Sequence, residues 1–194
     1  MNARLAAQMA FLMEADRLKE ITRANVTTGS RRPENSAEHS WHLALFALVL
    51  SEYADEDIDL NRVIVMLLLH DLVEIDAGDH PLHAEHDHAA IAAEEARAAD
   101  RLFGLLPDDQ AAQFRAIWEE FEAAETREAR FAKALDRFQP PTLNLATDGA
   151  SWVSHGADWD KVQARVSPAI ARGAPALWDW IGPQIEAWFA ENPF

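Results

Sequence analysis

The sequence predicts an all-α fold, and three features of its composition support this prediction. Alanine, leucine, glutamate and arginine dominate the 194 residues, and all four favour helices. Alternating runs of Val, Ile and Thr, which would indicate strands, are scarce. Hydrophobic residues make up 49% of the chain, which is enough for a sizeable core at the usual length of one domain. We therefore expect a single helical domain over residues 1–194.

The N-terminal part should contain two helices joined by a loop. The first helix is expected over residues 2–22, because its large apolar side chains fall on one helical face and should pack inward. A loop is expected over residues 25–33. Asn35 or Ser36 is a suitable N-cap for the next helix, and Glu38 is placed as a capping-box partner for Asn35. This second helix is expected to extend through Leu50.

Helix caps and breakers divide the rest of the chain. Asp59 should cap a helix that carries the apolar run of residues 63–69, and a turn is expected over residues 76–81. Further helices are expected over residues 88–104, 107–124 and from Thr126 onward, where Pro140 and Pro141 should stop or kink the helix. Two C-terminal helices are expected near residues 159–172 and 175–190. Five of the seven tryptophans follow residue 150, so this part should pack on the core or form a dimer face.

Charge and composition limit the classes of partner and compartment. The formal net charge of −16 repels polyanions, so a nucleic-acid polymer is not expected as a partner. A small phosphorylated substrate is compatible with this charge, because a metal ion and one or two arginines can reverse the local field. Cysteine is absent, no stretch is long enough to span a membrane, and the N-terminus lacks a signal-peptide cleavage site. We therefore expect a soluble, cytoplasmic protein with no membrane partner.

The pair His70–Asp71 is the most informative feature for chemistry. It ends the apolar run of residues 63–69, and a buried imidazole beside a buried carboxylate is costly unless both bind a common partner. A divalent metal ion is such a partner. His39 and Asp136 also lie near inward-facing apolar positions of expected helices, so they are further candidate ligands. Two imidazoles and two carboxylates suit Mn, Fe, Co, Ni or Zn and leave positions open for water and substrate.

Two acidic residues after this pair are candidates for catalysis. Glu74 lies four residues after His70 and three after Asp71, so it shares their face if the helix continues. It could orient or deprotonate a water molecule. Asp79 lies just beyond the turn-prone residues and could hydrogen-bond a substrate hydroxyl or protonate a leaving oxygen.

The order of these residues resembles that of the HD-domain metal-dependent phosphohydrolases, in particular their short, all-helical 5′-deoxynucleotidase-like branch. The matching segments are residues 34–40 (ENSAEHS), His70–Asp71 with Glu74, Gly78–Asp79, and residues 134–136 (ALD). The resemblance implies a single HD-domain helical bundle with the metal site in a core of about residues 18–140. The C-terminal helices, over about residues 150–194, would pack on this core or at a dimer face. The resemblance also implies a homodimer.

The resemblance further implies a role for each candidate residue. One divalent metal ion (Mn, Co, Fe, Ni or Zn) would be bound by His39, His70, Asp71 and Asp136. Glu74 would activate the attacking water and Asp79 would act on the substrate side, while Arg23 matches the arginine that orients the phosphate. Arg32 is a further candidate for phosphate contact. The expected reaction is hydrolysis of a small phosphomonoester, a (deoxy)nucleoside 5′-monophosphate, by water that the metal activates.

Two alternatives to this reaction remain open. Some HD proteins bind two irons and oxidise small molecules, and they use extra histidines between the HD pair and the final aspartate. Here four histidines, His80, His83, His86 and His88, lie in that interval, either in a solvated loop or at a second metal. The other alternative is a non-catalytic, metal-stabilised dimer that acts as a binding or regulatory module.

Overall fold

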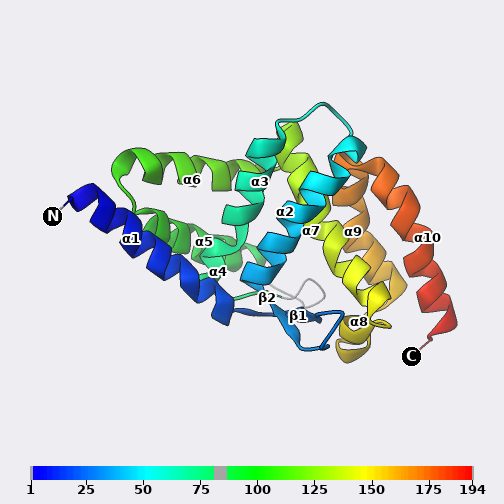
Figure 1. Cartoon of the computed structure of the whole chain (residues 1–194). Helices are drawn as coiled ribbons and strands as arrows, with labels where there is room; N and C mark the ends of the chain where they lie inside the picture. Colours follow the sequence, from blue (N-terminus) through cyan, green and yellow to red (C-terminus); the bar gives the residue numbers. More distant parts are fainter. Residues whose placement is uncertain (1, 81–86, 194) are drawn as a thin grey trace.

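The computed structural model describes residues 2–80 and 87–193, with the exception of the His88 side chain. Helices dominate these residues, which confirms the predicted all-α class, and one small antiparallel sheet accompanies them (Figure 1). The α-helices are α1 (Ala3–Ala15), α2 (Ser36–Leu50), α3 (Leu60–Leu69), α4 (Glu74–Ala77), α5 (His88–Phe103), α6 (Asp108–Ala123), α7 (Arg127–Ala146), α8 (Ala150–Ser154), α9 (Trp159–Gly173) and α10 (Pro175–Glu191). Short 3₁₀ helices are η1 (Asp16–Glu20), η2 (Ser51–Tyr53) and η3 (His70–Val73), and the strands are β1 (Thr22–Val26) and β2 (Pro33–Asn35).

Helices α2, α3 and α7 pack against one another at the centre of the molecule (Figure 1). On one side α9 and α10 cover α7, and on the other α5 and α6 pack together and meet α1, α3 and α7. The β1–β2 hairpin lies against one end of α7 and against α8. Buried apolar side chains form one continuous cluster from Phe11 in α1 to Ile185 in α10. This core fits the single domain expected over residues 1–194, which stays a prediction.

The helix starts that the sequence predicts are confirmed at three positions. Asn35 and Glu38 form a reciprocal capping box at the start of α2. The side chain of Asp59 accepts two backbone hydrogen bonds in the first turn of α3, and that of Thr126 accepts one from Ala129 in α7. These caps matter for the site, because they set where α2, α3 and α7 begin and therefore which side chains face inward.

The N-terminal part differs from the prediction in two respects. The first α-helix ends at Ala15 rather than at residue 22, and the loop expected over residues 25–33 is flanked by two paired strands. In α1 the expected inward face is exposed, and Phe11 alone among its described residues is buried. Helical spacing identifies an apolar stripe but not what covers it. The turn of the hairpin places Arg31 at φ 56°, and its guanidinium donates to the backbone oxygen of Thr147, so the hairpin depends on a contact distant in sequence.

Pro140 and Pro141 were expected to stop or kink the helix; α7 does not stop at them but continues to Ala146. The carbonyl oxygen of Pro140 accepts hydrogen bonds from the side chains of Asn25 of β1 and Asn144, which tie this part of the helix to the hairpin. Packing against α9 and burial of Pro141 further stabilise the helix. The C-terminal helices α9 and α10 are confirmed, and they pack on the core. Helix α8 was not expected.

No helix in the described part of the chain combines the length and the apolar character that crossing a bilayer requires.

Candidate metal centre

Three elements distant in sequence bring the predicted metal ligands together. His39 comes from the first turns of α2, His70 and Asp71 begin η3 directly after α3, and Asp136 comes from α7. All four residues are buried. One ligand atom each from His39, His70 and Asp136 lies within 4.8 Å of the other two. Oδ1 of Asp71 is 2.9 Å from Nε2 of His70, and Oδ2 of Asp71 is 3.9 Å from Nε2 of His39.

The periodicity of the helices explains why these polar groups face inward. In α3 the residues Val63, Met66 and Leu67 form the buried face, and His70 extends it by one turn. Asp136 likewise lies on the face of α7 that buries Ala132. The imidazole of His70 packs edge-to-face on Phe121 of α6, with ring centroids 4.8 Å apart, which fixes the plane of the ring.

The hydrogen bonds of the two imidazoles show that the group fits a metal ion. Nδ1 of His70 lies 2.9 Å from the backbone oxygen of Leu67, so it carries the ring proton and Nε2 bears a lone pair. That Nε2 is buried without a hydrogen-bond partner, yet it faces the carboxylate of Asp71. Nε2 of His39 similarly faces Oδ1 of Asp136 at 3.0 Å. Lone pairs that face carboxylates need a cation between them, and this N/O set suits a divalent transition metal.

The pKa values of the ligands show the same need for positive charge. Burial acts to lower the pKa of His70, but the negative charges of Asp71 and Asp136 outweigh it and raise this pKa to about 10. Burial acts to raise the pKa of Asp136, but Arg137, His39 and His70 hold it well below its usual range. Protein that lacks the ion thus places a proton on His70, where a metal would otherwise supply the charge.

Arg23 of β1 connects the ligands to the two predicted catalytic acids. Its Nη1 atom lies 2.9 Å from Oδ2 of Asp71, 3.4 Å from Oδ1 of Asp79 and 3.5 Å from Oε1 of Glu74. The side chain of Arg23 is 12% exposed. Ser36, the first residue of α2, donates a hydrogen bond of 2.6 Å to Oε2 of Glu74. The structure therefore brings Arg23, Glu74 and Asp79 together beside the metal group.

Burial changes the acidity of both catalytic candidates. It raises the pKa of Glu74 well above its usual value, and the neighbouring charge of Asp71 acts in the same direction. It also raises the pKa of Asp79, although Arg23 opposes this shift. Carboxyl groups with raised pKa values are suited to proton transfer near neutral pH.

Two groups of predicted residues lie elsewhere. Arg32 pairs with Glu38 through its two terminal nitrogens, Nη1 and Nη2. Its side chain is half exposed and does not line the cavity. Of the histidine cluster, His80 lines the cavity, whereas His83 and His86 and the side chain of His88 lie outside the described residues.

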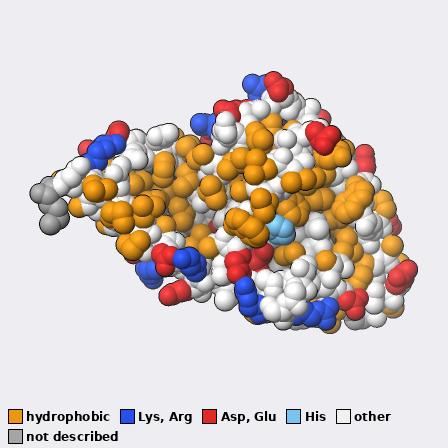
Figure 2. Space-filling view, in the orientation of Figure 1, with side chains coloured by type: hydrophobic (Ala, Val, Ile, Leu, Met, Phe, Trp, Pro, Cys, Tyr) orange, Lys and Arg blue, Asp and Glu red, His pale blue; other side chains and the backbone are white. Residues whose placement is uncertain are grey.

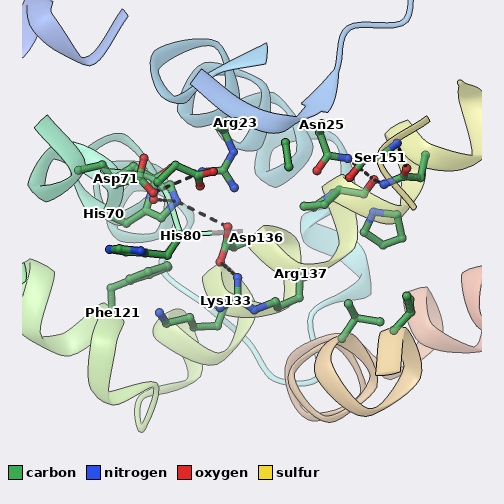
Figure 3. Close-up of a pocket in the computed structure, with 18 of the residues that line it drawn as sticks. Arg23, Asn25, His70, Asp71, His80, Phe121, Lys133, Asp136, Arg137 and Ser151 are labelled. Atoms are coloured by element: carbon green, nitrogen blue, oxygen red, sulfur yellow. Dashed lines mark hydrogen bonds and ion pairs between the residues drawn. The ribbon is translucent and has the colours of Figure 1, made fainter. Parts of the chain in front are cut away.

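A cavity of about 180 Å³ opens beside the metal group (Figure 3). Arg23 lies on one side of it, and Lys133 and Arg137 lie on the α7 side with Asp136. The sequence analysis missed both cations, although the spacing of residues 133, 136 and 137 places them on one helical face. Lys133 pairs with Glu122 at 3.0 Å and lies over the ring of Phe121.

Other lining residues carried no signal in the sequence. Glu95 of α5 and Glu122 of α6 line the cavity, and burial with the charge of Glu122 raises the pKa of Glu95 to about 6. On the far side lie Asn25, Ser151 and Trp152 (Figure 3 labels the first two). Asn25 belongs to β1 and the others to helices, and only the packing of β1, α5, α6 and α8 brings them to the cavity.

Proteins with a similar sequence or structure were found. The crystal structure of a predicted metal-dependent phosphohydrolase from Magnetospirillum magnetotacticum MS-1 is 50% identical, with a TM-score of 0.87, over 97% of this chain and 92% of that chain. The 5′-deoxynucleotidases of Bos taurus and Homo sapiens are 31% and 29% identical over 134 residues, or 66% of this chain. The match spans 62% of the length of these two curated relatives.

The family assignment rests on a longer match. The sequence profile of the HD domain matches residues 15–178, a range that includes every predicted site residue from Arg23 to Asp136. The predicted resemblance to HD-domain proteins of the 5′-deoxynucleotidase-like branch is thereby confirmed. Because this match covers most of the sequence, the chain belongs to the HD domain family.

Proposed function

We propose that this protein is a metal-dependent phosphohydrolase that hydrolyses a small phosphomonoester, specifically a (deoxy)nucleoside 5′-monophosphate. The observation that carries the proposal is the position of Arg23, 2.9 Å from a carboxylate of the metal group and within 3.5 Å of Glu74 and Asp79. A metal that served only to stabilise the fold would not require an arginine and two further acids at its side. The names of the curated relatives, 5′-deoxynucleotidases, support the choice of substrate.

His39, His70, Asp71 and Asp136 would hold one divalent ion (Mn, Co, Fe, Ni or Zn). Such an ion supplies Lewis acidity, which polarises a phosphate ester and lowers the pKa of water toward neutrality. The N/O donor set and the orphaned, buried Nε2 of His70 support this assignment. Among the described residues, His39, His70 and Asp136 place one ligand atom each within 4.8 Å of one another, and Asp71 lies beside them.

The remaining residues of the site would bind the phosphate and move protons. Arg23 would exchange part of its contact with the three carboxylates for the phosphoryl oxygens and stabilise the charge that develops on them. Glu74, held by Ser36 and with a raised pKa, would accept the proton of the attacking water. Asp79, whose pKa burial also raises, would donate a proton to the leaving oxygen.

Phosphate release by metal-stripped protein tests this function. We would screen nucleoside and deoxynucleoside 5′-monophosphates together with non-nucleotide phosphoesters, adding Mn, Co, Fe, Ni and Zn singly. Release should require a metal and should disappear in Asp71→Ala, which removes a ligand. It should persist in Asp57→Ala, which removes an exposed carboxylate outside the cavity.

Other outcomes would point to the two alternatives. No release with any of the five metals, from protein that binds one equivalent, would contradict the proposal and favour a binding or regulatory module. Two equivalents of iron together with oxygen uptake would favour the di-iron oxygenase.

A homodimer is the second part of the proposal, through a surface that we call the α2–α3 face. Its exposed apolar side chains are Trp41, Leu45, Leu48 and Val49 of α2 and Val65 and Leu68 of α3. Figure 2 shows hydrophobic side chains gathered over these helices. The sequence suggested the tryptophan-rich C-terminal part instead, but Trp152 is buried there and Trp180 alone of its five tryptophans is strongly exposed. Contiguous exposed apolar surface is typical of interfaces.

A cytoplasmic location belongs to the same proposal, because the expected substrates are solutes of the cytoplasm. The net charge of −16 supports a small substrate rather than a nucleic-acid polymer.

A further inference from the structure

A buried polar network contacts His39 at the ring nitrogen that does not face Asp136. The amide of Gln139 in α7 lies between His39, Glu34 of β2 and His42 of α2. Its Oε1 atom is 3.2 Å from Nδ1 of His39, and its Nε2 atom is 2.9 Å from Oε1 of Glu34 and 3.3 Å from Nδ1 of His42. The side chains of His39, Gln139 and Glu34 are all buried. Because they are buried, these side chains have few other hydrogen-bond partners available.

Glu34 determines the orientation of this amide. A carboxylate only accepts hydrogen bonds, so the nitrogen of the Gln139 amide, rather than its oxygen, must face Glu34. The amide oxygen then faces Nδ1 of His39, which must carry the ring proton in order to donate to it. Oε2 of Glu34 lies 3.6 Å from the same nitrogen, so its negative charge also favours a proton there. Nε2 of His39 is left with its lone pair, directed into the metal group.

Hydrogen bonding within the fold does not account for a carboxylate at position 34. Oε2 of Glu34 is buried and has no hydrogen-bond partner, which is unfavourable in a protein interior. A negative charge near the Nδ1 side of a histidine strengthens the binding of a cation at Nε2, as carboxylates do behind metal-ligating histidines. Stronger cation binding at Nε2 of His39 thus accounts for the unfavourable burial of Glu34.

We propose that Glu34, acting through Gln139, holds His39 in the tautomer whose Nε2 can bind a metal ion and thereby raises the affinity of the site for divalent metals. Glu34 and Gln139 are positioning residues, since they lie behind the ligand. This inference rests on the metal centre of the proposed function, but not on its substrate or its reaction.

Exchanging the carboxylate of position 34 and the amide of position 139 tests the inference. In Glu34→Gln, the amide of Gln139 is free to take either orientation and the charge behind His39 is lost. The affinity for Co²⁺, measured by titration of metal-stripped protein, should fall about 10-fold or more. In Glu34→Gln/Gln139→Glu, the new carboxylate accepts directly from Nδ1 of His39 and from the amide at position 34. The affinity and the visible Co²⁺ spectrum should return to within about 3-fold of the original protein.

The matched control is Gln113→Glu, which adds the same charge at an exposed position of α6 and should leave Co²⁺ affinity unchanged. Thermal unfolding of the metal-free variants would show that they remain folded. Equal affinity in Glu34→Gln and the original protein, or a double variant no better than the single one, would overturn the inference. So would an original protein that binds none of the metals.

A second measurement needs no variant. Nitrogen-15 NMR of the zinc-loaded protein should show the proton of His39 on Nδ1, and a proton on Nε2 would overturn the inference. Because both readouts concern the metal and the ring, protein that binds Co²⁺ as expected but releases no phosphate would contradict the proposed function and leave this inference intact.

Discussion

The guanidinium of Arg23 lies 2.9 Å from the carboxylate of Asp71, although 48 residues separate them in sequence. Asp71 is therefore shared between the metal group and the arginine expected to bind phosphate. Arg23 in turn balances the charges of Asp71, Glu74 and Asp79, and these charges hold its pKa above the usual arginine value despite burial. Any anion that binds Arg23 must compete with these carboxylates, so anion binding should depend strongly on the position of the guanidinium.

Arg23→Lys should separate the charge of the arginine from its geometry. Lysine keeps the positive charge that balances the three carboxylates, but it lacks the planar fork that binds two phosphate oxygens at once. We expect kcat/KM for a nucleoside monophosphate to fall about 10- to 100-fold, while metal affinity stays within about 3-fold.

The control for this prediction is Arg32→Lys, since Arg32 lies on the same hairpin but outside the cavity. It should have little effect. An equal loss of kcat/KM in both variants would contradict the role of Arg23 and would revive the phosphate contact that the sequence suggested for Arg32.

Glu74→Gln should separate proton transfer from metal binding. The substitution keeps the size of the side chain and an acceptor for the Ser36 hydroxyl but removes the group that takes a proton. Turnover should fall about 10²- to 10⁴-fold, as for other general bases, while metal content measured by elemental analysis stays at one equivalent. Loss of the metal in this variant would make Glu74 a ligand and the assignment wrong.

Glu95→Gln should increase stability at neutral pH. The pKa of Glu95 is about 6 in the folded protein and 4.5 in the reference state, so the folded state binds more protons between these values. The free energy of unfolding should therefore fall as the pH rises through this window. Removing the charge should raise it by about 1 kcal/mol at pH 7.5, allowing for partial exposure, and should change nothing below pH 4.

Chemical denaturation at both pH values checks this prediction. A stabilisation of the same size at pH 4 and pH 7.5 would show that packing, rather than the charge of Glu95, is responsible.

Charges on the α2–α3 face should dissociate the proposed homodimer. In Leu45→Asp/Val49→Asp, two carboxylates would have to be buried between the protomers, which should weaken association roughly 100-fold by the cost of burying unpaired charge. Light scattering at several protein concentrations measures the change.

Val153→Asp is the matched control, because Val153 is 56% exposed on α8, outside this face. Its association should equal that of the original protein. A double variant that remains as dimeric as the original protein, or an original protein that is monomeric throughout, would contradict the proposed interface.

Much of the fold was predictable because it depends on local chemistry. The caps at Asn35, Asp59 and Thr126 act within one helical turn, so their residue types and spacing suffice to place the helix starts. The prediction was wrong where distant contacts decide. Helix α7 continues through Pro140 and Pro141 where it packs against α9 and β1, and the hairpin pairs strands with no alternating pattern.

The sequence by itself determined the helical class, which follows from composition and periodicity. It also offered candidate metal ligands, through polar residues on apolar helical faces and through the resemblance to HD-domain proteins. Only the tertiary structure decided that Lys133 and Arg137 face the cavity, that Arg32 does not, and that Glu34 and Gln139 lie behind His39. The physical reason is that helix packing sets the distances between side chains far apart in sequence, and no local sequence pattern determines these distances.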